Sequence, residues 1–202
     1  MIRRLEEEGK GQKSEGEQEA LSQKMLKTRT ILLSGEINKE LAEKVIRQLL
    51  LLEADSDDSI KVFIDSPGGD ADAGFAIYDM IRFIKPDVYT IGMGLVASAG
   101  SLILLAAPVD KRIGLPNSHY LIHQPLSGIR GVATEIEIHA NELEKLRVKI
   151  NKLIAAETGM DEKKIGEDTD RDCWMSAEDG LEYKLVSKII CKRAELDQLD
   201  KS

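Results

Sequence analysis

Short apolar runs alternate with helical periodicities over residues 30–123. Runs bounded by polar, Gly or Pro residues predict strands at 30–33, 60–65, 88–91, 112–115 and 120–123. Apolar residues at helical spacing predict helices at 38–54, with Asn38 as the N-cap, and at 71–84 and 98–107. Strands that alternate with helices through short links favour a parallel sheet covered by helices. The pattern therefore predicts an α/β fold built as a spiral of βα units.

One long helical pattern, at 132–157, dominates the second half of the chain. At about 1.5 Å per residue it spans roughly 39 Å, which is more than a domain of this size needs. Its apolar positions are Val132, Ile136, Leu143, Leu146, Ile150, Leu153 and Ile154. A helix that outreaches its own core commonly buries the excess against another surface, so the pattern indicates an oligomer, with a long surface helix as the alternative. Shorter helices are predicted at 161–167 and 176–183, and a strand at 186–190.

The distribution of charge divides the chain into three segments. Residues 1–27 are polar and densely charged with both signs, and such a segment buries too little apolar surface to offset its ordering entropy. We therefore expect a mobile charged N-terminal segment at 1–27, one folded domain at 28–193 and a polar C-terminal tail at 194–202.

The composition is that of an ordinary globular protein, 42% hydrophobic and 32% charged. The net charge is −8, and no cluster of Lys and Arg is interleaved with aromatic residues, which argues against nucleic-acid binding. No apolar run reaches the roughly 20 residues of a membrane span, and no signal peptide is recognisable. The two cysteines, Cys173 and Cys191, lack metal-ligand spacing. We expect a cytoplasmic protein with reduced thiols, no bound metal and no membrane contact.

The first candidate for chemistry is the Gly-rich loop 65–70, which lies between a predicted strand and a predicted helix. Glycine tolerates positive φ, so this backbone can turn sharply and direct N–H groups toward a phosphate or a developing oxyanion. A plain β-turn is the alternative. The loop lacks the lysine of a nucleotide-binding P-loop, which disfavours nucleotide binding.

A serine and a histidine are the next candidates. Ser98 follows a predicted strand and opens a predicted helix, where a serine is either an N-cap or a nucleophile at the positive helix end. The surrounding residues are not the G-x-S-x-G elbow, because Val96 occupies the first Gly position. His123 ends a predicted strand, where packing and catalysis are both open. Of the other histidines, His119 shares its strand face and His139 lies in the long helix.

The acidic run at 167–172 contains three aspartates, Asp168, Asp170 and Asp172. A solvated surface is the simplest interpretation of such a run. A Ser-His pair that acts as a hydrolase also needs a carboxylate to orient the histidine ring. The run supplies candidates for that role.

Four segments together are more specific than any of them alone. They are Ser66-Pro67-Gly68-Gly69, Ala97-Ser98-Ala99-Gly100, Ile122-His123-Gln124-Pro125 and Asp170-Arg171-Asp172. In order and spacing they closely resemble the ClpP family, the proteolytic subunits of the Clp proteases. The resemblance covers residues 28–190 and includes the stretches 84–88, 115–118 and 135–140.

The resemblance implies a crotonase-like spiral fold with a long protruding handle helix. It also implies a serine endopeptidase in which Ser98 is the nucleophile, His123 the general base and then acid, and Asp172 the orienting carboxylate. The backbone N–H groups of Gly69 and Ala99 are implied to form the oxyanion hole.

Assembly and partners are likewise implied by the resemblance. The handle helix is expected to join two stacked heptameric rings into a tetradecamer, with Asp170 and Arg171 at the contact between rings. Unfolded polypeptides are the expected substrates, delivered by a hexameric AAA+ unfoldase that uses ATP, whereas this subunit needs no cofactor. The implied docking residues for the unfoldase are Lys61, Phe63, Phe83, Ile91, Met93 and Leu115.

Three departures from the family pattern keep other functions open. Ala99 stands where the family usually has Met, Lys61 stands at a docking position that is usually Tyr, and the segment through Lys27 lacks the apolar residues that line the family's axial pore. One alternative is therefore an assembly or regulatory paralogue in mixed rings with a second ClpP, with little activity alone. Another is an acyl-CoA enzyme of the wider crotonase-like fold.

Overall fold

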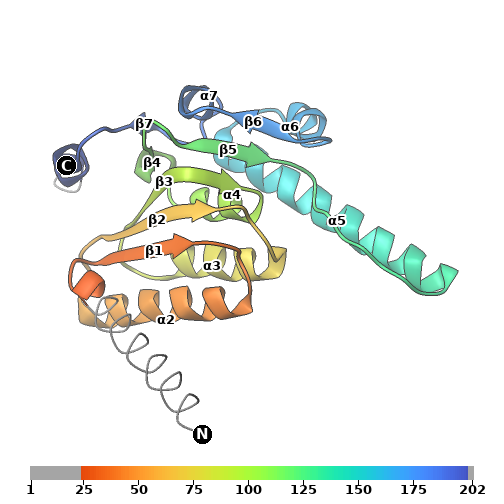
Figure 1. The fold of residues 1–202 in the computed structure, drawn as a ribbon, viewed down its shortest axis with the longest axis horizontal. Helices are drawn as coiled ribbons and strands as arrows, with labels where there is room; N and C mark the ends of the chain where they lie inside the picture. The colour runs from red at the N-terminus through yellow and green to blue at the C-terminus, as the bar shows by residue number, and fades with distance from the viewer. Residues whose placement is uncertain (1–23, 200–202) are drawn as a thin grey trace, which may run out of the picture.

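A computed structural model describes residues 24–199, which form one mixed sheet flanked by helices (Figure 1). The strands are β1 (Thr30–Ser34), β2 (Ile60–Ser66), β3 (Val88–Ala97), β4 (Arg112–Gly114), β5 (His119–Ile122), β6 (Cys173–Met175) and β7 (Lys188–Ile189). The sheet runs in the order β1-β2-β3-β4-β7, and β5 pairs with both β3 and β6. Every pairing is parallel except that of β5 with β6, so the predicted parallel α/β core is confirmed.

Three helices follow the first three strands, as the alternating pattern predicted. They are α2 (Lys39–Asp55), α3 (Ala71–Phe83) and the short α4 (Ala99–Leu104). Asn38 caps α2 by accepting a hydrogen bond from the Leu41 N–H, and Asp70 caps α3 in the same way through Ala73. Figure 1 shows α2 and α3 side by side beneath β1 and β2. Their apolar faces supply much of the core.

Strand β3 is longer than the predicted strand at 88–91 and changes partners along its length. Residues 90–92 pair with β4, whereas residues 95–97 pair with β5. Between the two halves the register with β2 shifts, and Gly94 has φ of 55°. The Asp65 carboxylate accepts a hydrogen bond from the Leu95 N–H at 3.1 Å, which holds this irregularity. The link expected between the strand at 88–91 and the helix at 98–107 is therefore a bulge that carries the strand on to Ala97, directly before Ser98.

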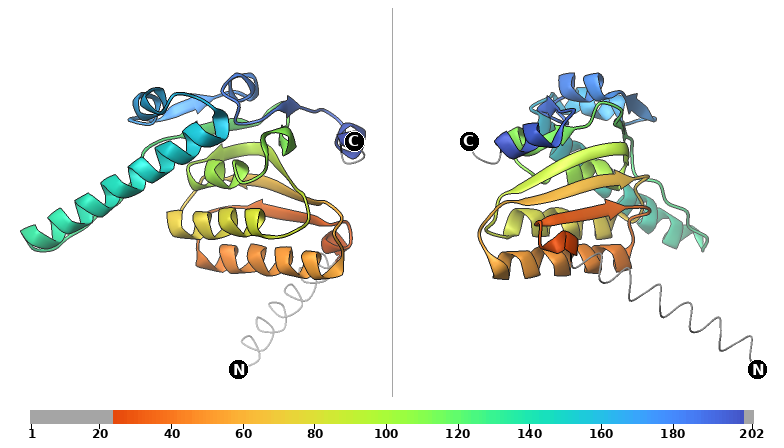
Figure 2. Two further views of the ribbon diagram at one scale, coloured as in Figure 1. Left: turned by 180° about the vertical axis from the view of Figure 1, so that it is seen from behind. Right: turned by 60° about the vertical axis from the view of Figure 1, so that its left-hand side comes forward.

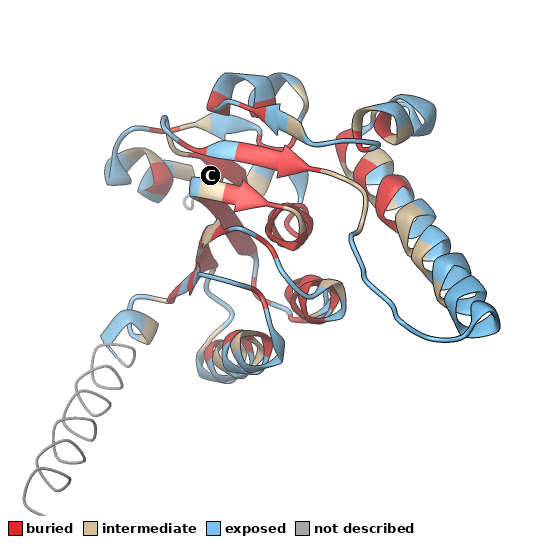
Figure 3. Cartoon of the chain, turned by 45° about the vertical axis from the view of Figure 1, so that its right-hand side comes forward, coloured by how far each residue is buried: buried red, intermediate tan, exposed pale blue. Residues whose placement is uncertain are grey.

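Helix α5 (Ala133–Thr158) has 26 residues and projects away from the sheet (Figures 1 and 2). Its buried residues are Ile150, Asn151, Ile154 and Thr158, all in its second half. Figure 3 shows the helix buried at that end and exposed at the other. Within residues 24–199, no helix combines the length and apolar character needed to cross a bilayer.

The C-terminal region contains elements that the sequence did not predict. Helix α6 (Glu162–Asp168) and helix α7 (Ala177–Glu182) match predicted helices, but β6 between them was expected to be a loop. Outside this region, the sequence also did not predict the 3₁₀ turn η1 (Val109–Lys111) between α4 and β4. The segment expected to be a polar tail instead begins with helix α8 (Arg193–Leu199). It forms because Leu196, only 1% exposed, packs into a cluster with Ile91 and Ile113. Residues 1–23, which hold most of the expected mobile segment, lie outside the described part.

Candidate active site

The candidate catalytic residues meet at one edge of the sheet. Gly69 follows β2, Ser98 follows β3 and His123 follows β5, so all three lie at the carboxyl ends of parallel strands. Asp172 directly precedes β6, whose antiparallel direction returns the chain to the same edge. Ligand sites of open α/β sheets form at this edge, because loops from successive strands converge there.

Ser98 occupies the N-cap position of α4 without acting as a cap. Its side chain makes no capping hydrogen bond, and its backbone has φ of 55° and ψ of −119°. A non-glycine residue in such a conformation is strained and is found where the surrounding structure requires it. The Ser98 N–H donates to the Leu121 carbonyl at 2.8 Å, so β5 holds the strained turn. The hydroxyl is thereby presented at the sheet edge, as in a nucleophile elbow.

His123 and Asp172 form a direct pair. The distance from His123 Nδ1 to Asp172 Oδ1 is 3.2 Å, while the side chains are 15% and 60% exposed. A carboxylate on Nδ1 orients the ring and leaves Nε2 for a nucleophile. Among the described residues the Ser98 hydroxyl has no hydrogen-bond partner. The hydrogen bond between a catalytic serine and its histidine is commonly long or poorly aligned in a ligand-free enzyme.

The Gly-rich loop packs directly against Ser98. Gly68 has φ of 94°, and a Cβ added there would lie 2.7 Å from Ser98 Cβ and 2.8 Å from the Ala97 carbonyl oxygen. Its neighbour Gly69 has φ of 145° and bridges to Ile37, whose N–H donates to the Gly68 carbonyl at 2.8 Å. Among the backbone hydrogen bonds in turns, loops and caps of residues 24–199, none is donated by the N–H of Gly69 or Ala99. The loop is therefore not the plain β-turn that the sequence left open, because Gly69 forms a parallel β-bridge with Ile37.

Gly69→Ala is expected to lower kcat/KM for a fluorogenic peptide by about 100-fold or more, because it displaces a backbone donor beside Ser98. The added Cβ would lie 2.2 Å from the Ile37 carbonyl oxygen, so the loop must move. Gly128→Ala is the matched control, since a Cβ at that position meets nothing within 4 Å. Full activity of Gly69→Ala would contradict the close packing of this loop.

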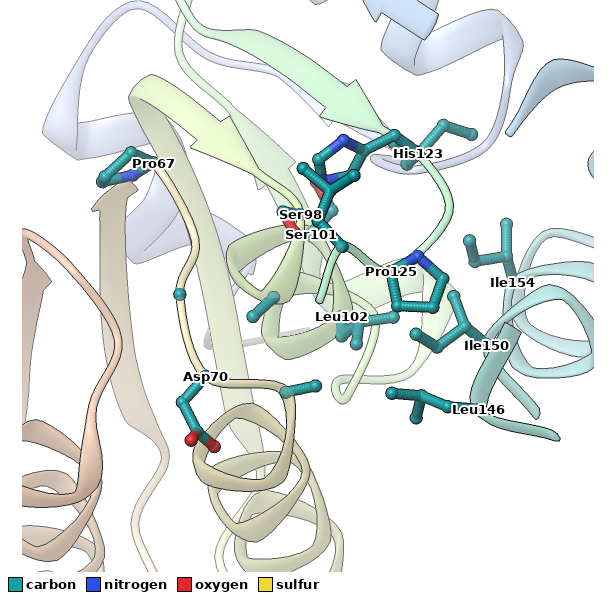
Figure 4. A pocket seen from close by; sticks show the side chains of 15 residues that line it. Pro67, Asp70, Ser98, Ser101, Leu102, His123, Pro125, Leu146, Ile150 and Ile154 are labelled. Atoms are coloured by element: carbon teal, nitrogen blue, oxygen red, sulfur yellow. The ribbon is translucent and has the colours of Figure 1, made fainter. Parts of the chain in front are cut away.

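A cavity of about 410 Å³ opens beside Ser98 and His123 (Figure 4). Its floor is apolar and is formed by Leu102, Ile122, Leu126, Leu146, Ile150 and Ile154. The last three residues belong to α5, so this helix contributes a wall of the candidate site. The sequence showed them only as part of an apolar stripe, which we attributed to oligomerisation. Their second role could be found only from the folded arrangement.

Cys173, next to Asp172, is a second nucleophilic side chain near the site. Both cysteines are free, and Cys173 is partly buried. Burial raises the pKa of the Cys173 thiol, and the nearby Asp168 carboxylate raises it further. The thiolate is the reactive form of cysteine, so this thiol is poorly suited to attack at neutral pH.

Comparison with known proteins decides the family. A sequence profile of the family described as Clp protease matches residues 12–193. The chain belongs to the Clp protease family. Clp proteolytic subunit 2 of Treponema denticola is 69% identical over 181 residues, covering 89% of this chain and 90% of that protein. Clp proteolytic subunit 3 of Rhizobium etli is 49% identical over 172 residues, covering 85% and 89%.

A solved ClpP structure has the same fold. A mutant of ClpP1 from Listeria monocytogenes superposes with a TM-score of 0.82 at 50% identity, covering 87% of this chain and 99% of that one. The family resemblance, the ClpP-like spiral fold and the assignment as a serine peptidase of the Clp proteases are thus confirmed. These findings favour the peptidase over the assembly paralogue, and they give no support to an acyl-CoA enzyme.

The residues predicted to dock the unfoldase do not form one exposed surface on the Clp chain. Lys61 and Ile91 are buried, at 8% and 0% exposure, whereas Phe83 is 79% exposed at the end of α3. Phe63 and Leu115 are partly buried against the cluster that α8 covers. Helix α8, in the segment expected to be a tail, covers this cluster through Leu196 and Leu199. Met93 is half-buried, and the docking role of all six residues stays a prediction.

Asp170 and Arg171, predicted at the contact between rings, lie exposed beside His123. Asp170 Oδ1 is 3.9 Å from Arg147 Nη1 on α5, and its carbonyl accepts a hydrogen bond from the Gln124 side chain at 2.6 Å. The structure therefore joins this acidic loop to both the handle helix and the segment after β5 that carries His123. The role of the pair between rings stays a prediction.

Proposed function

We propose that Ser98, His123 and Asp172 are the catalytic triad of this Clp peptidase. The observation that carries the proposal is the His123–Asp172 pair at 3.2 Å, at the same sheet edge as the strained and uncapped Ser98. His123 Nε2 takes the Ser98 proton while Oγ attacks the peptide carbonyl carbon. The Asp172 carboxylate stabilises the resulting imidazolium. The N–H groups of Gly69 and Ala99 donate to the oxyanion of the tetrahedral intermediate.

The second half of the reaction uses the same groups. His123 donates its proton to the leaving amine, and an acyl-enzyme remains on Ser98 Oγ. Water then loses a proton to His123 and attacks the ester, which releases the carboxyl product and restores the Ser98 hydroxyl. The apolar cavity beside Ser98 is suited to an apolar side chain of an extended polypeptide.

We also propose a cytoplasmic tetradecamer of two heptameric rings that degrades unfolded polypeptides delivered by a Clp-type AAA+ unfoldase. The exposed first half of α5 supports this assembly, since Ile136 and Ile138 are 42% and 60% exposed there and Val132, just before the helix, is 65% exposed. Asp170 and Arg171 are proposed to lie at the ring contact, and Phe63, Phe83 and Leu115 at the unfoldase surface. ATP is used by the unfoldase, and this subunit needs no cofactor or metal.

Labelling with a serine-reactive phosphonate, read by intact mass, tests the proposal. We expect one adduct per chain in the wild type and none in Ser98→Ala. Ser101→Ala is the matched control and should retain the adduct, because the Ser101 hydroxyl is buried and bonded to the carbonyls of Val96 and Leu121. Native mass spectrometry of the same preparation reports its assembly. An assembled wild type that takes no adduct would contradict the triad and favour the paralogue in mixed rings.

A further inference from the structure

The loop at 169–172 carries Asp172. Contacts of its other residues hold this loop in place, and packing of the Asp172 side chain does not. The Asp172 side chain is 60% exposed. In the part of the chain described here, its carboxylate has one hydrogen-bond partner, His123. An exposed side chain with one contact samples other rotamers unless its main chain is fixed. The position of the acid therefore depends on how this loop is anchored.

Both ends of the loop are tied to the neighbours of His123. Cys173, which directly follows Asp172, pairs with Ile122, which directly precedes His123, in the ladder between β5 and β6. At the other end, the Gln124 N–H donates to the Thr169 carbonyl at 2.7 Å. The Gln124 side-chain amide donates to the Asp170 carbonyl at 2.6 Å. These contacts set the loop beside His123 and tie it to the sheet through β5, but they do not connect it to helix α5.

A buried polar contact supplies that second anchor. Thr169 is 1% exposed, and its hydroxyl oxygen lies 2.9 Å from Asn151 Oδ1 and 2.8 Å from the Ile165 carbonyl oxygen. Asn151 is 7% exposed and belongs to α5. Polar groups buried this deeply must keep their partners, so the contact tolerates little displacement. One turn earlier on the same face of α5, Arg147 approaches Asp170 at 3.9 Å.

We propose that Thr169 and Asn151 are positioning residues for the catalytic acid, fastening the Asp172 loop to helix α5. Helix α5 also lines the cavity beside Ser98 through Leu146 and Ile150, so one helix sets both the cavity wall and the place of the acid. The inference rests on the proposed role of Asp172 in the triad. Neither residue touches the substrate, and both act through the orientation of Asp172 and His123.

The test compares Thr169→Val, which keeps the shape of the side chain and removes the hydroxyl, with Thr169→Ser, which keeps the hydroxyl. For a fluorogenic peptide we expect Thr169→Val to lower kcat by about 10- to 100-fold with KM changed by less than about twofold, because misplaced catalytic groups slow chemistry and not binding. The rate of phosphonate labelling at Ser98 should fall in the same proportion. Thr169→Ser should restore kcat to within about threefold of the wild type. Asn151→Leu should behave like Thr169→Val.

Thr158→Val is the matched control for the loss of a buried hydroxyl. Thr158 lies on the same helix, is 3% exposed and donates to the Ile154 carbonyl at 2.7 Å, without contacting the acid loop. We expect it to lower the thermal midpoint while leaving kcat unchanged. If Thr169→Val lowers only the midpoint, as Thr158→Val does, the positioning role is wrong. If Thr169→Val fails to fold, the same comparison of kcat is made between Asn151→Leu and Thr169→Ser, and it tests the positioning role in the same way. A wild type without a Ser98 adduct would instead overturn the triad, and the positioning role with it.

Discussion

Replacing His123 with alanine is expected to lower kcat/KM for peptide hydrolysis by about 10⁴-fold or more. Without the imidazole, no group at the site takes the Ser98 proton, and Asp172 loses its only hydrogen-bond partner among the described residues. The measurement is hydrolysis of a fluorogenic peptide by assembled protein. Phosphonate labelling at Ser98 should be lost together with turnover, because both need the activated hydroxyl.

His119→Ala is the matched control for this prediction. His119 begins β5, the strand that His123 follows, but its exposed ring stacks on Trp174 with centroids 6.0 Å apart. Its removal should leave kcat/KM within about threefold of the wild type, as for a surface change away from the reacting atoms. Comparable losses of kcat/KM in the two variants would mean that the disturbance of β5, and not the removal of the His123 imidazole, lowers activity. Retained activity in His123→Ala would remove His123 from the triad.

Replacing Arg112 with methionine is expected to destabilise the fold by about 3–5 kcal/mol, since it removes the most buried partner of Glu157 and leaves two backbone carbonyls without their donors. Arg112 is 1% exposed and forms an ion pair with Glu157 through Nη2. It also donates to the Ala107 carbonyl at 2.7 Å and to the Glu157 carbonyl at 2.9 Å. The measurement is urea unfolding followed by circular dichroism.

The same Glu157 carboxylate accepts hydrogen bonds from two further donors, which keep it partly paired when Arg112 is removed. The Tyr78 hydroxyl donates to it at 2.9 Å and Arg82 at 2.8 Å, so the base of α5 is joined to α3 and β4. Burial raises the pKa of Tyr78 to about 12, and Glu157 contributes to that rise. Burial lowers the pKa of Arg112, and the ion pair with Glu157 opposes that shift.

Arg47→Met is the control for the ion pair. Arg47 pairs with Glu43 one turn away on α2, with the two side chains 67% and 69% exposed. Exposed pairs of this kind contribute at most about 1 kcal/mol, because water and salt screen the charges. Equal losses in the two variants would show that the buried network at Glu157 adds nothing specific.

The local patterns of the sequence determined most of the core and the identity of the triad candidates. The strands β1 and β2, the cap at Asn38 and the full length of α5 follow from apolar spacing and capping chemistry, which depend on residues a few positions apart. Taken singly, the serine could be an N-cap, the histidine a packing residue and the acidic run a solvated surface. Only the four segments taken together resemble the Clp proteolytic subunits.

The tertiary structure alone decided the features that depend on distant partners. Strand β6 is three residues long and forms because β5 offers it an antiparallel edge. Helix α8 forms because Leu196 finds a cluster built from β3 and β4. The contact of Thr169 with Asn151 joins residues 18 positions apart that carry no local signal of pairing. Burial and hydrogen bonding of this kind act through space, so the order of residues along the chain does not reveal them.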